Sequence, residues 1–262
     1  MPTPEGLPLL SQSHAPHGVR LLNPLTGQLT DLPPFATLLT PEQLNDRQGD
    51  KEFLVRGVAV ADDSTVAICL TFHRGLAIAK PGDERWTSVS FDHRLRLYST
   101  LSFAGRIYCA SAEGTMTLEI SSDQPLRLLM AAKMATTPHY FMAMTDSLHL
   151  VDNGGELLLR HRMIRADGGH KLKRRCAASL TPVESLSGRA VFVGSSRSVS
   201  LPASMCSSSI RGDTVYVGFD CDEKGKIDGY HVGDGTTQPS RLTKHTWRFR
   251  PWTLADCLSW CI

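Results

Sequence analysis

The strongest local charge in the sequence is basic. Lys171, Lys173, Arg174 and Arg175 lie within six residues of chain. Such a run could contact phosphate groups or serve as a nuclear address. Aromatic residues that could stack on nucleic-acid bases are absent nearby, and the net charge of the chain is only +2. We therefore interpret the run as a solvated strand edge and loop, where Lys discourages edge pairing, and expect no nucleic-acid partner.

An acidic stretch between residues 220 and 231 superficially resembles a calcium-binding loop. Asp220 and Asp222 stand at the first and third positions, and Gly225 stands at the sixth. However, Lys224 would place a cation at a ligand position, and His231 replaces the bidentate Glu that closes such loops. We interpret the stretch as an exposed hairpin tip and expect no metal.

Catalytic motifs are missing from the sequence. Ser195, Ser196 and Ser198 follow Gly194 without the pattern of a nucleophile elbow, and no phosphate-binding glycine loop occurs. Acidic pairs such as residues 62–63 and 83–84 fall in predicted turns and are interpreted as solvated. We expect a protein that is not an enzyme and that has no cofactor.

The seven cysteines are odd in number and scattered, without a CxxC pair. This pattern favours buried, reduced thiols over disulfides or a metal site.

The elements that would carry these residues are short strands. Residues 190–193, 198–201 and 214–217 are apolar or alternating runs bounded by Gly, Pro or Asp. A period of two with such boundaries predicts half-buried antiparallel strands. In the third run, Val215 and Val217 are expected on one face and Tyr216 on the other.

Hairpins with glycine-bearing turns recur along the chain. They are predicted over residues 58–81, 101–120, 148–162 and 214–230, and Asn153-Gly154 predicts a type I′ turn in the third. The recurrence, about every 40 to 50 residues, is typical of the four-stranded antiparallel blades of a β-propeller. The sequence thus predicts an all-β propeller of about five blades, incomplete or unclosed, with the first blade the least complete. A β-sandwich is the structural alternative.

Four passages of the chain resemble a known family. They read LLNPLTG at residues 21–27 followed by DLPP at 31–34, LAIAKPGD at 76–83 followed by Trp86 and Val89, DNGGELLL at 152–159, and VESL at 183–186 followed by RAVFVG at 189–194. In this order they are similar to the plant F-box-associated KIB-type β-propeller family, also called domain of unknown function 295.

The resemblance implies a propeller that often follows an F-box. In such proteins the F-box binds a Skp1-type adaptor of a cullin ubiquitin ligase, and the propeller selects the substrate. No F-box is recognisable here, because residues 1–16 are too short and too rich in proline for that helical module. We therefore expect a non-enzymatic protein-interaction propeller with an unknown protein partner. The alternatives are a small-ligand-binding or enzymatic propeller and a truncated family member with little independent function.

The expected organisation is an N-terminal tail over residues 1–16, a propeller over residues 17–246 and a C-terminal tail over residues 247–262. The N-terminus lacks the basic and apolar regions of a secretory signal, and no apolar run has the length of a membrane span. We expect a cytoplasmic or nuclear protein with no membrane partner.

Overall fold

The computed structural model describes most of the chain. The described residues are 7, 9–11, 18–39, 55–70, 75–92, 95–120, 125–134, 146–164, 170–176, 183–193, 198–206, 208, 210–217 and 228–238. Within them, only the backbone is described at residues 56, 146–147, 161–164, 170–176, 217, 228 and 237–238. The chain divides into two compact units, Met1–Leu148 and His149–Ile262.

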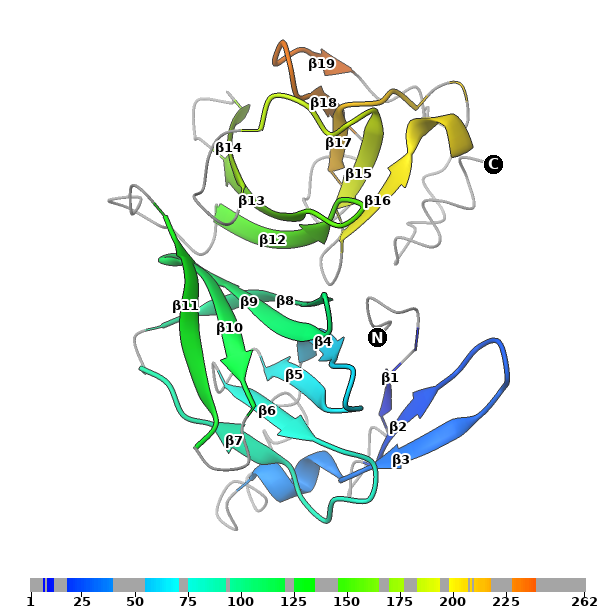
Figure 1. The fold of residues 1–262 in the computed structure, drawn as a ribbon, viewed down its shortest axis with the longest axis vertical. Helices are drawn as coiled ribbons and strands as arrows, with labels where there is room; N and C mark the ends of the chain where they lie inside the picture. Colours follow the sequence, from blue (N-terminus) through cyan, green and yellow to red (C-terminus); the bar gives the residue numbers. More distant parts are fainter. Residues whose placement is uncertain are drawn as a thin grey trace. The chain divides into compact units, whose positions relative to one another are not determined.

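Three sheets build the first unit (Figure 1). Sheet I contains β1 (Leu9–Ser11), β2 (Val19–Leu22) and β3 (Leu29–Leu32), and is followed by the short 3-10 helix η1 (Phe35–Leu38). Sheet II contains β4 (Val55–Val60), β5 (Val66–Leu70), β6 (Leu76–Ala79) and β7 (Thr87–Val89). Sheet III contains β8 (Leu97–Phe103), β9 (Arg106–Ser111), β10 (Gly114–Glu119) and β11 (Arg127–Lys133).

Two further sheets follow along the chain. Sheet IV contains β12 (Asp146–Asp152), β13 (Leu157–Ile164) and β14 (His170–Cys176). Sheet V contains β15 (Arg189–Val193), β16 (Ser198–Pro202), β17 (Thr214–Val217), β18 (Asp228–His231) and β19 (Thr237–Gln238), with the 3-10 helix η3 (Ala203–Met205) after β16. No sheet closes on itself among the described strands.

This architecture confirms the all-β prediction. Sheets II and III are four-stranded antiparallel meanders, and the hairpins predicted over residues 58–81, 101–120 and 214–230 are antiparallel strand pairs. Strand β1 was not expected, since it lies within residues 1–16, which the sequence analysis assigned to a tail. It pairs antiparallel with β2 and extends the edge of the first sheet, and Leu9 is buried in the core that sheets I and II share.

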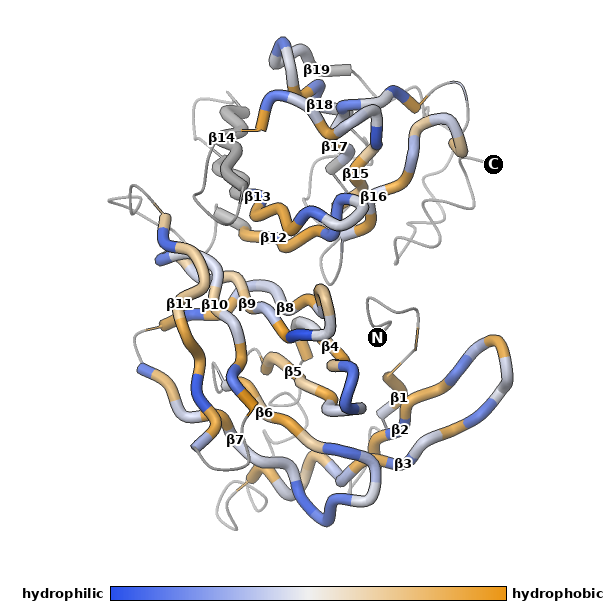
Figure 2. Tube along the Cα trace, viewed as in Figure 1, coloured by the Kyte–Doolittle hydropathy of each residue, from blue (hydrophilic) through white to orange (hydrophobic). Residues whose placement is uncertain are grey.

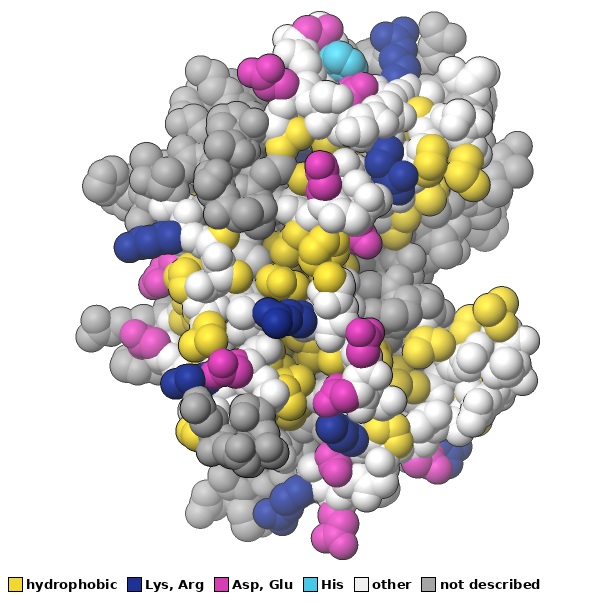
Figure 3. Space-filling model, viewed as in Figure 1, with side chains coloured by type: hydrophobic (Ala, Val, Ile, Leu, Met, Phe, Trp, Pro, Cys, Tyr) yellow, Lys and Arg dark blue, Asp and Glu magenta, His cyan; other side chains and the backbone are white. Residues whose placement is uncertain are grey.

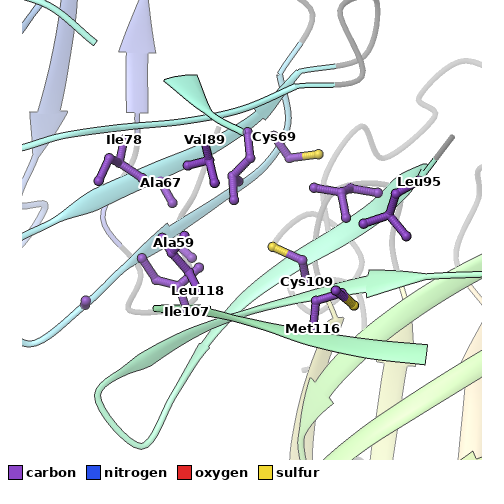
Figure 4. Close-up of a cluster of buried hydrophobic side chains, with 13 residues drawn as sticks. Ala59, Ala67, Cys69, Ile78, Val89, Leu95, Ile107, Cys109, Met116 and Leu118 are labelled. Atoms are coloured by element: carbon purple, nitrogen blue, oxygen red, sulfur yellow. The ribbon is translucent and has the colours of Figure 1, made fainter. Parts of the chain in front are cut away.

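The central strands of sheet II, β5 and β6, are buried on both faces. Val66 and Ile68 of β5 belong to a core shared with sheet I, whereas Ala67 and Cys69 belong to a core shared with sheet III (Figure 4). Successive side chains of a strand point to opposite faces, so a sheet packed between two others buries both sets. The central strand β6 is hydrophobic along its length, while the loop after it is hydrophilic (Figure 2).

Sheet V departs from a simple meander. β15 pairs antiparallel with β16, as predicted, but parallel with β17, so the strand order is β16-β15-β17. Parallel neighbours need a crossover rather than a tight turn, and residues 203–213 supply it. The predicted alternation within β17 is confirmed, because Val215 packs in the core shared with sheet IV and Tyr216 in a separate cluster with Phe192.

The turn of the third predicted hairpin is shifted by one residue. Gly154 and Gly155 have φ values of +70° and +97°, the sign that both central positions of a type I′ turn require. The flanking Asn153 donates its backbone N–H to the carbonyl of Glu156 at 2.8 Å. The buried Asn153 side chain is thereby left for tertiary contacts.

Candidate interaction site

A cavity lies in the first unit, between sheets II and III. It has a volume of about 480 Å³ and is open to solvent. Its walls come from the β4–β5 turn, the start of β9, the end of β10 and the middle of β11. The lining residues are Ala61, Asp62, Asp63, Gly105, Arg106, Ile107, Thr117, Leu118, Glu119, Ile120 and Leu129.

Two hairpin turns are tied together at the cavity. The backbone N–H of Val60 donates to the hydroxyl of Ser102 at 2.7 Å, and the N–H of Asp62 lies 3.5 Å from the carbonyl of Gly105. The β4–β5 turn is also closed internally, from the N–H of Ala61 to the carbonyl of Thr65 at 2.8 Å. These contacts fix the acidic turn of sheet II beside the start of β9.

The acidic groups of the cavity are largely neutralised by neighbours. Lys80 Nζ lies 2.8 Å from Asp63 Oδ2, and Arg127 Nε lies 2.6 Å from Glu119 Oε2. Partial burial raises the pKa of Asp63, but hydrogen bonds from Lys80 and Thr65 outweigh it, so the net pKa is lowered. Asp63 is therefore held as a carboxylate and is a weak base.

Apolar side chains form the floor of the cavity. Ile107 and Leu118 are buried, whereas Ile120 and Leu129 are 38% and 36% exposed. Arg106 lines the same cavity and forms no ion pair within the described part of the chain. Figure 3 shows apolar, acidic and basic side chains interspersed on one face of the molecule. The cavity therefore has an apolar floor and a rim that carries charged side chains of both signs.

The sequence analysis did not single out this site. Residues 62–63 were predicted to be solvated turn residues, and the turn is confirmed, although Asp63 is ion-paired. No sequence pattern pointed to Arg106 as a site residue, because the residues that meet at the cavity come from four separate strands or turns. Periodicity cannot reveal such a convergence.

Passages that carry the resemblance described in the sequence analysis meet in the structure through hydrogen bonds. Trp86 donates its indole N–H to the carbonyl of Pro33 at 2.7 Å, and its backbone N–H to the hydroxyl of Thr37 at 3.2 Å. Its ring packs on Phe35 with centroids 5.9 Å apart. The LPP passage of sheet I is thus joined to the tryptophan that follows the PGD turn of sheet II.

A second contact of this kind lies in the second unit. Asn153 donates from Nδ2 to the carbonyl of Leu186 at 3.4 Å and accepts from the hydroxyl of Ser200 at 2.6 Å. Arg189 in turn donates to the hydroxyl and the carbonyl of Ser200, both at 2.9 Å. The NGG turn of sheet IV is thereby joined to the first hairpin of sheet V.

The predicted basic run lies on β14. Its backbone pairs antiparallel with β13, with Lys171 opposite Met163, Lys173 opposite His161, Arg174 opposite Arg160 and Arg175 opposite Leu159. The side chains of these four basic residues are outside the described part of the structure, so the patch remains a prediction.

The other sequence candidates are only partly described. Residues 220–225 and 195–196 lie outside the described residues, while Ser198 is a buried residue of β16. Within the described ranges, no group of three or more His, Cys, Asp or Glu side chains is arranged to hold a metal ion. The helices of those ranges include none that is both long and apolar enough to cross a membrane.

Comparison with known families identifies the chain. The family model described as KIB1-4 beta-propeller matches residues 5–235. The chain belongs to this family. The matched range contains every strand of the five sheets except β19, so the family fold accounts for the observed succession of short antiparallel sheets.

Solved structures similar to this KIB1-4 propeller are distant. A virginiamycin B lyase from Staphylococcus aureus is 13% identical with a TM-score of 0.43, covering 94% of this chain and 69% of its own. A streptogramin B lyase is 11% identical with a TM-score of 0.39, covering 93% and 82%. A Bacteroides caccae protein of unknown function is 10% identical with a TM-score of 0.38, covering 89% and 72%. At these values the likenesses carry no argument about function.

Comparison with curated proteins finds no match to the chain.

Proposed function

We propose that this KIB1-4 propeller is a non-enzymatic protein-interaction domain that binds a partner protein at the cavity between sheets II and III. The observation that carries the proposal is the cavity's composition. Ile107, Leu118, Ile120 and Leu129 provide an apolar floor, and Arg106 stands at its rim with charged neighbours. Protein interfaces combine an apolar centre with a polar rim in this way.

The electrostatics of the cavity favour binding over catalysis. A general base works best when its pKa is raised toward the working pH. The pKa of Asp63 moves the opposite way: burial raises it, and the hydrogen bonds from Lys80 and Thr65 more than offset that rise. A carboxylate whose pKa is lowered and that pairs with Lys80 suits recognition of a charged partner better than proton transfer near neutral pH.

The resemblance to plant F-box-associated propellers suggests the class of partner. In that family the propeller selects substrates for a cullin ubiquitin ligase. We propose that the partner here is a protein of that kind, either a ligase substrate or a protein that full-length relatives also bind. Recruitment of a Skp1-type adaptor is a separate question, which the same experiment addresses.

The experiment is a quantitative affinity purification of the tagged chain from its own cells. Wild type is compared with Arg106→Glu and Ile120→Asp, which change the rim and the exposed part of the floor. Arg85→Glu is the matched control, because Arg85 is equally an exposed arginine but does not line the cavity. Skp1-type adaptors and cullins are scored together with all other proteins recovered.

Specific proteins that are recovered with wild type and Arg85→Glu but lost with both cavity variants would support the proposal. If the same partner proteins are recovered with the two cavity variants as with wild type, the binding surface lies outside the cavity. If adaptors and cullins are among the lost proteins, the chain reaches a ligase. If only chaperones are recovered, the result favours the alternative that the chain is a truncated family member with little independent function.

A second candidate function follows from the cavity volume. About 480 Å³ lies within the range of small-molecule sites. If the propeller binds a small ligand there, adding the right metabolite should raise the melting temperature of the wild-type protein. Arg106→Glu should abolish that rise. Such a result, with no protein partner dependent on the cavity, would favour this alternative.

A further inference from the structure

The outer face of sheet I carries exposed apolar side chains. The inner face belongs to the core shared with sheet II, where four of its residues are buried: Leu9, Val19, Leu21 and Leu32. On the outer face, Leu10 and Leu29 are 44% and 48% exposed. Leu25, in the turn that joins β2 and β3, is 94% exposed, and the hairpin projects from the other strands of the first unit (Figure 1). Exposed leucines gathered on one side of a hairpin mark an interaction surface.

The register of the β2–β3 hairpin places two residue pairs side by side on this outer face. Arg20 lies opposite Asp31, and Leu22 lies opposite Leu29. Residues directly opposite each other in an antiparallel pair share a face, and so do residues two apart along one strand. The four consecutive pairs of the hairpin follow one register, so the charged pair and the apolar pair form adjacent rows of the same face.

The charged row is neutral as a unit. Arg20 Nε lies 2.7 Å from Asp31 Oδ1, and the two side chains are 53% and 78% exposed. An exposed ion pair of this kind contributes little to the stability of a single chain. Its two groups can therefore take new partners across an interface without a large loss. A partner with a strong charge of one sign is not favoured by this face.

A second copy of the same hairpin fits these rows by symmetry. A two-fold axis that runs along the strands, midway between β2 and β3, exchanges the two members of every cross-strand pair. Two copies packed face to face about that axis would place Arg20 over Asp31 of the second copy, and Leu22 over its Leu29. An interface between two identical subunits requires such a self-complementary surface. Sheets that pack face to face keep their strands nearly aligned, which this axis permits.

Charge selects this axis over its neighbours. An axis along β2 itself would place Arg20 over Arg20 of the second copy, and an axis along β3 would do the same with Asp31. Like charges that face each other across an interface are disfavoured. The axis between the strands also passes through the turn that joins them, so Leu25 would lie beside its own counterpart.

From these observations we propose that two copies of this chain associate through the outer faces of their β2–β3 hairpins, about a two-fold axis between the two strands. The surface is small for a protein interface, so the dimer should be weak, with a dissociation constant of about 10–100 µM. The proposal goes beyond the partner-binding function, because no residue of this hairpin lines the cavity between sheets II and III.

The first test is sedimentation of the full chain over a concentration series from about 1 to 300 µM. The wild-type chain is expected to change from monomer to dimer across this range. Leu25→Asp should weaken the dimer by about tenfold or more, since it brings two like charges together near the axis. Met205→Asp is the matched control, because Met205 is 77% exposed but lies in η3, outside the hairpin.

The second test changes the charges of one row. Arg20→Asp and Asp31→Arg should each abolish the homodimer, because all four groups of the row then carry one sign. A mixture of these two variants should form a heterodimer, since the acidic pair of one copy then faces the basic pair of the other. The double variant, which exchanges the two charges, should again form a homodimer. A fluorescent label on one variant identifies the heterodimer in the mixture.

Several outcomes would overturn the proposal. One is a wild-type chain that stays monomeric at the highest concentration, and another is a dimer that survives Arg20→Asp, because its interface would then lie elsewhere. A mixture of the two charge variants that stays monomeric would exclude the two-fold arrangement. If wild type is monomeric and Leu25→Asp lowers the melting temperature while Met205→Asp does not, another part of the same chain covers the face and the proposal is wrong.

The hairpin interface and the cavity can fail separately. A wild-type dimer, combined with partner recovery that does not depend on Arg106 or Ile120, would support the hairpin interface and refute binding at the cavity. A monomeric wild-type chain whose partner recovery depends on those two residues would refute the hairpin interface and support the cavity.

Discussion

At the scale of single residues, a few side chains hold turns by accepting several backbone donors at once. Asp213 is the clearest case, with a φ of +54° in the turn before β17. Its Oδ1 accepts from the hydroxyl of Ser185 at 2.8 Å, from the N–H of Gly188 at 3.3 Å and from the N–H of Leu186. One carboxylate thus stabilises the start of β15 from the far side of the crossover.

We predict that Asp213→Asn lowers stability and flattens its dependence on acid pH. Partial burial raises the pKa of Asp213, but the hydrogen bonds from Ser185, Leu186 and Gly188 outweigh it, so the net pKa is lowered from 3.8. Between the lowered folded value and the ordinary unfolded value, the unfolded state binds more protons, so stability rises with pH there. The contribution is fully present above the unfolded pKa and is lost as the pH falls through the folded one.

Urea denaturation at a series of pH values measures this effect. At neutral pH the variant should lose about 1–2 kcal/mol, the difference between a charge-assisted and a neutral hydrogen-bond acceptor. Its stability should also fall less steeply than that of wild type below about pH 4. Glu84→Gln, at an exposed position without a hydrogen bond or ion pair in the described residues, is the control. Parallel acid profiles for wild type and Asp213→Asn would contradict the assignment.

At the scale of elements, sheet pairing depends on backbone space as much as on side chains. β10 begins at Gly114, which lies opposite Lys133 at the end of β11. Gly114 has a φ of +148°, and a Cβ there would lie 2.1 Å from the carbonyl oxygen of Ala132. The obstruction is backbone, so it cannot be relieved by a side-chain rotation.

We predict that Gly114→Ala destabilises the protein much more than Gly27→Ala. Gly27 also has a positive φ, +72°, but a Cβ there would meet nothing within 4 Å. The Gly27 variant should lose about 1 kcal/mol of unfolding free energy, because alanine disfavours the positive φ. The Gly114 variant should lose about 3 kcal/mol or more. Chemical denaturation of the two variants measures the difference. If the two variants lose equal amounts of unfolding free energy, β10 and β11 can separate at the Gly114 end without a further loss of stability.

At the scale of the whole molecule, stability lies in cores shared between neighbouring sheets. Cys69 of β5 and Cys109 of β9 belong to the core between sheets II and III (Figure 4). Both thiols are buried, and burial above all raises the pKa of Cys109. Only the thiolate reacts readily with alkylating agents, so these two cysteines report the opening of the core.

We predict that iodoacetamide modifies Cys206 before Cys69 and Cys109 in the native protein. Cys206, after η3, is only partly buried, although burial also raises its pKa. Peptide mapping by mass spectrometry measures the order, and mild urea should bring the rates at the two core cysteines toward that at Cys206. Modification of Cys109 as fast as Cys206 under native conditions would show that sheets II and III separate readily.

Much of this protein was determined by local sequence. Period-two alternation predicted β15 and β17 and assigned Val215 and Tyr216 to opposite faces, because side-chain direction along a strand depends only on the backbone. The turn at residues 23–27 is also local, because Gly27 takes a φ of +72° and Asn23 Oδ1 accepts from the backbone N–H groups of Leu25 and Thr26. These features follow from the preferences of neighbouring residues and do not require the rest of the chain.

Tertiary structure decided which strands became neighbours and which residues met. The alternation of β15, β16 and β17 is compatible with a meander, yet β17 lies parallel to β15, because the crossover at residues 203–213 can reach the other side of β15. Burial of both faces of β5 depends on the sheets packed against it. The cavity beside Arg106 likewise exists only because two hairpin turns from different sheets are held together, a contact between distant residues that no local pattern encodes.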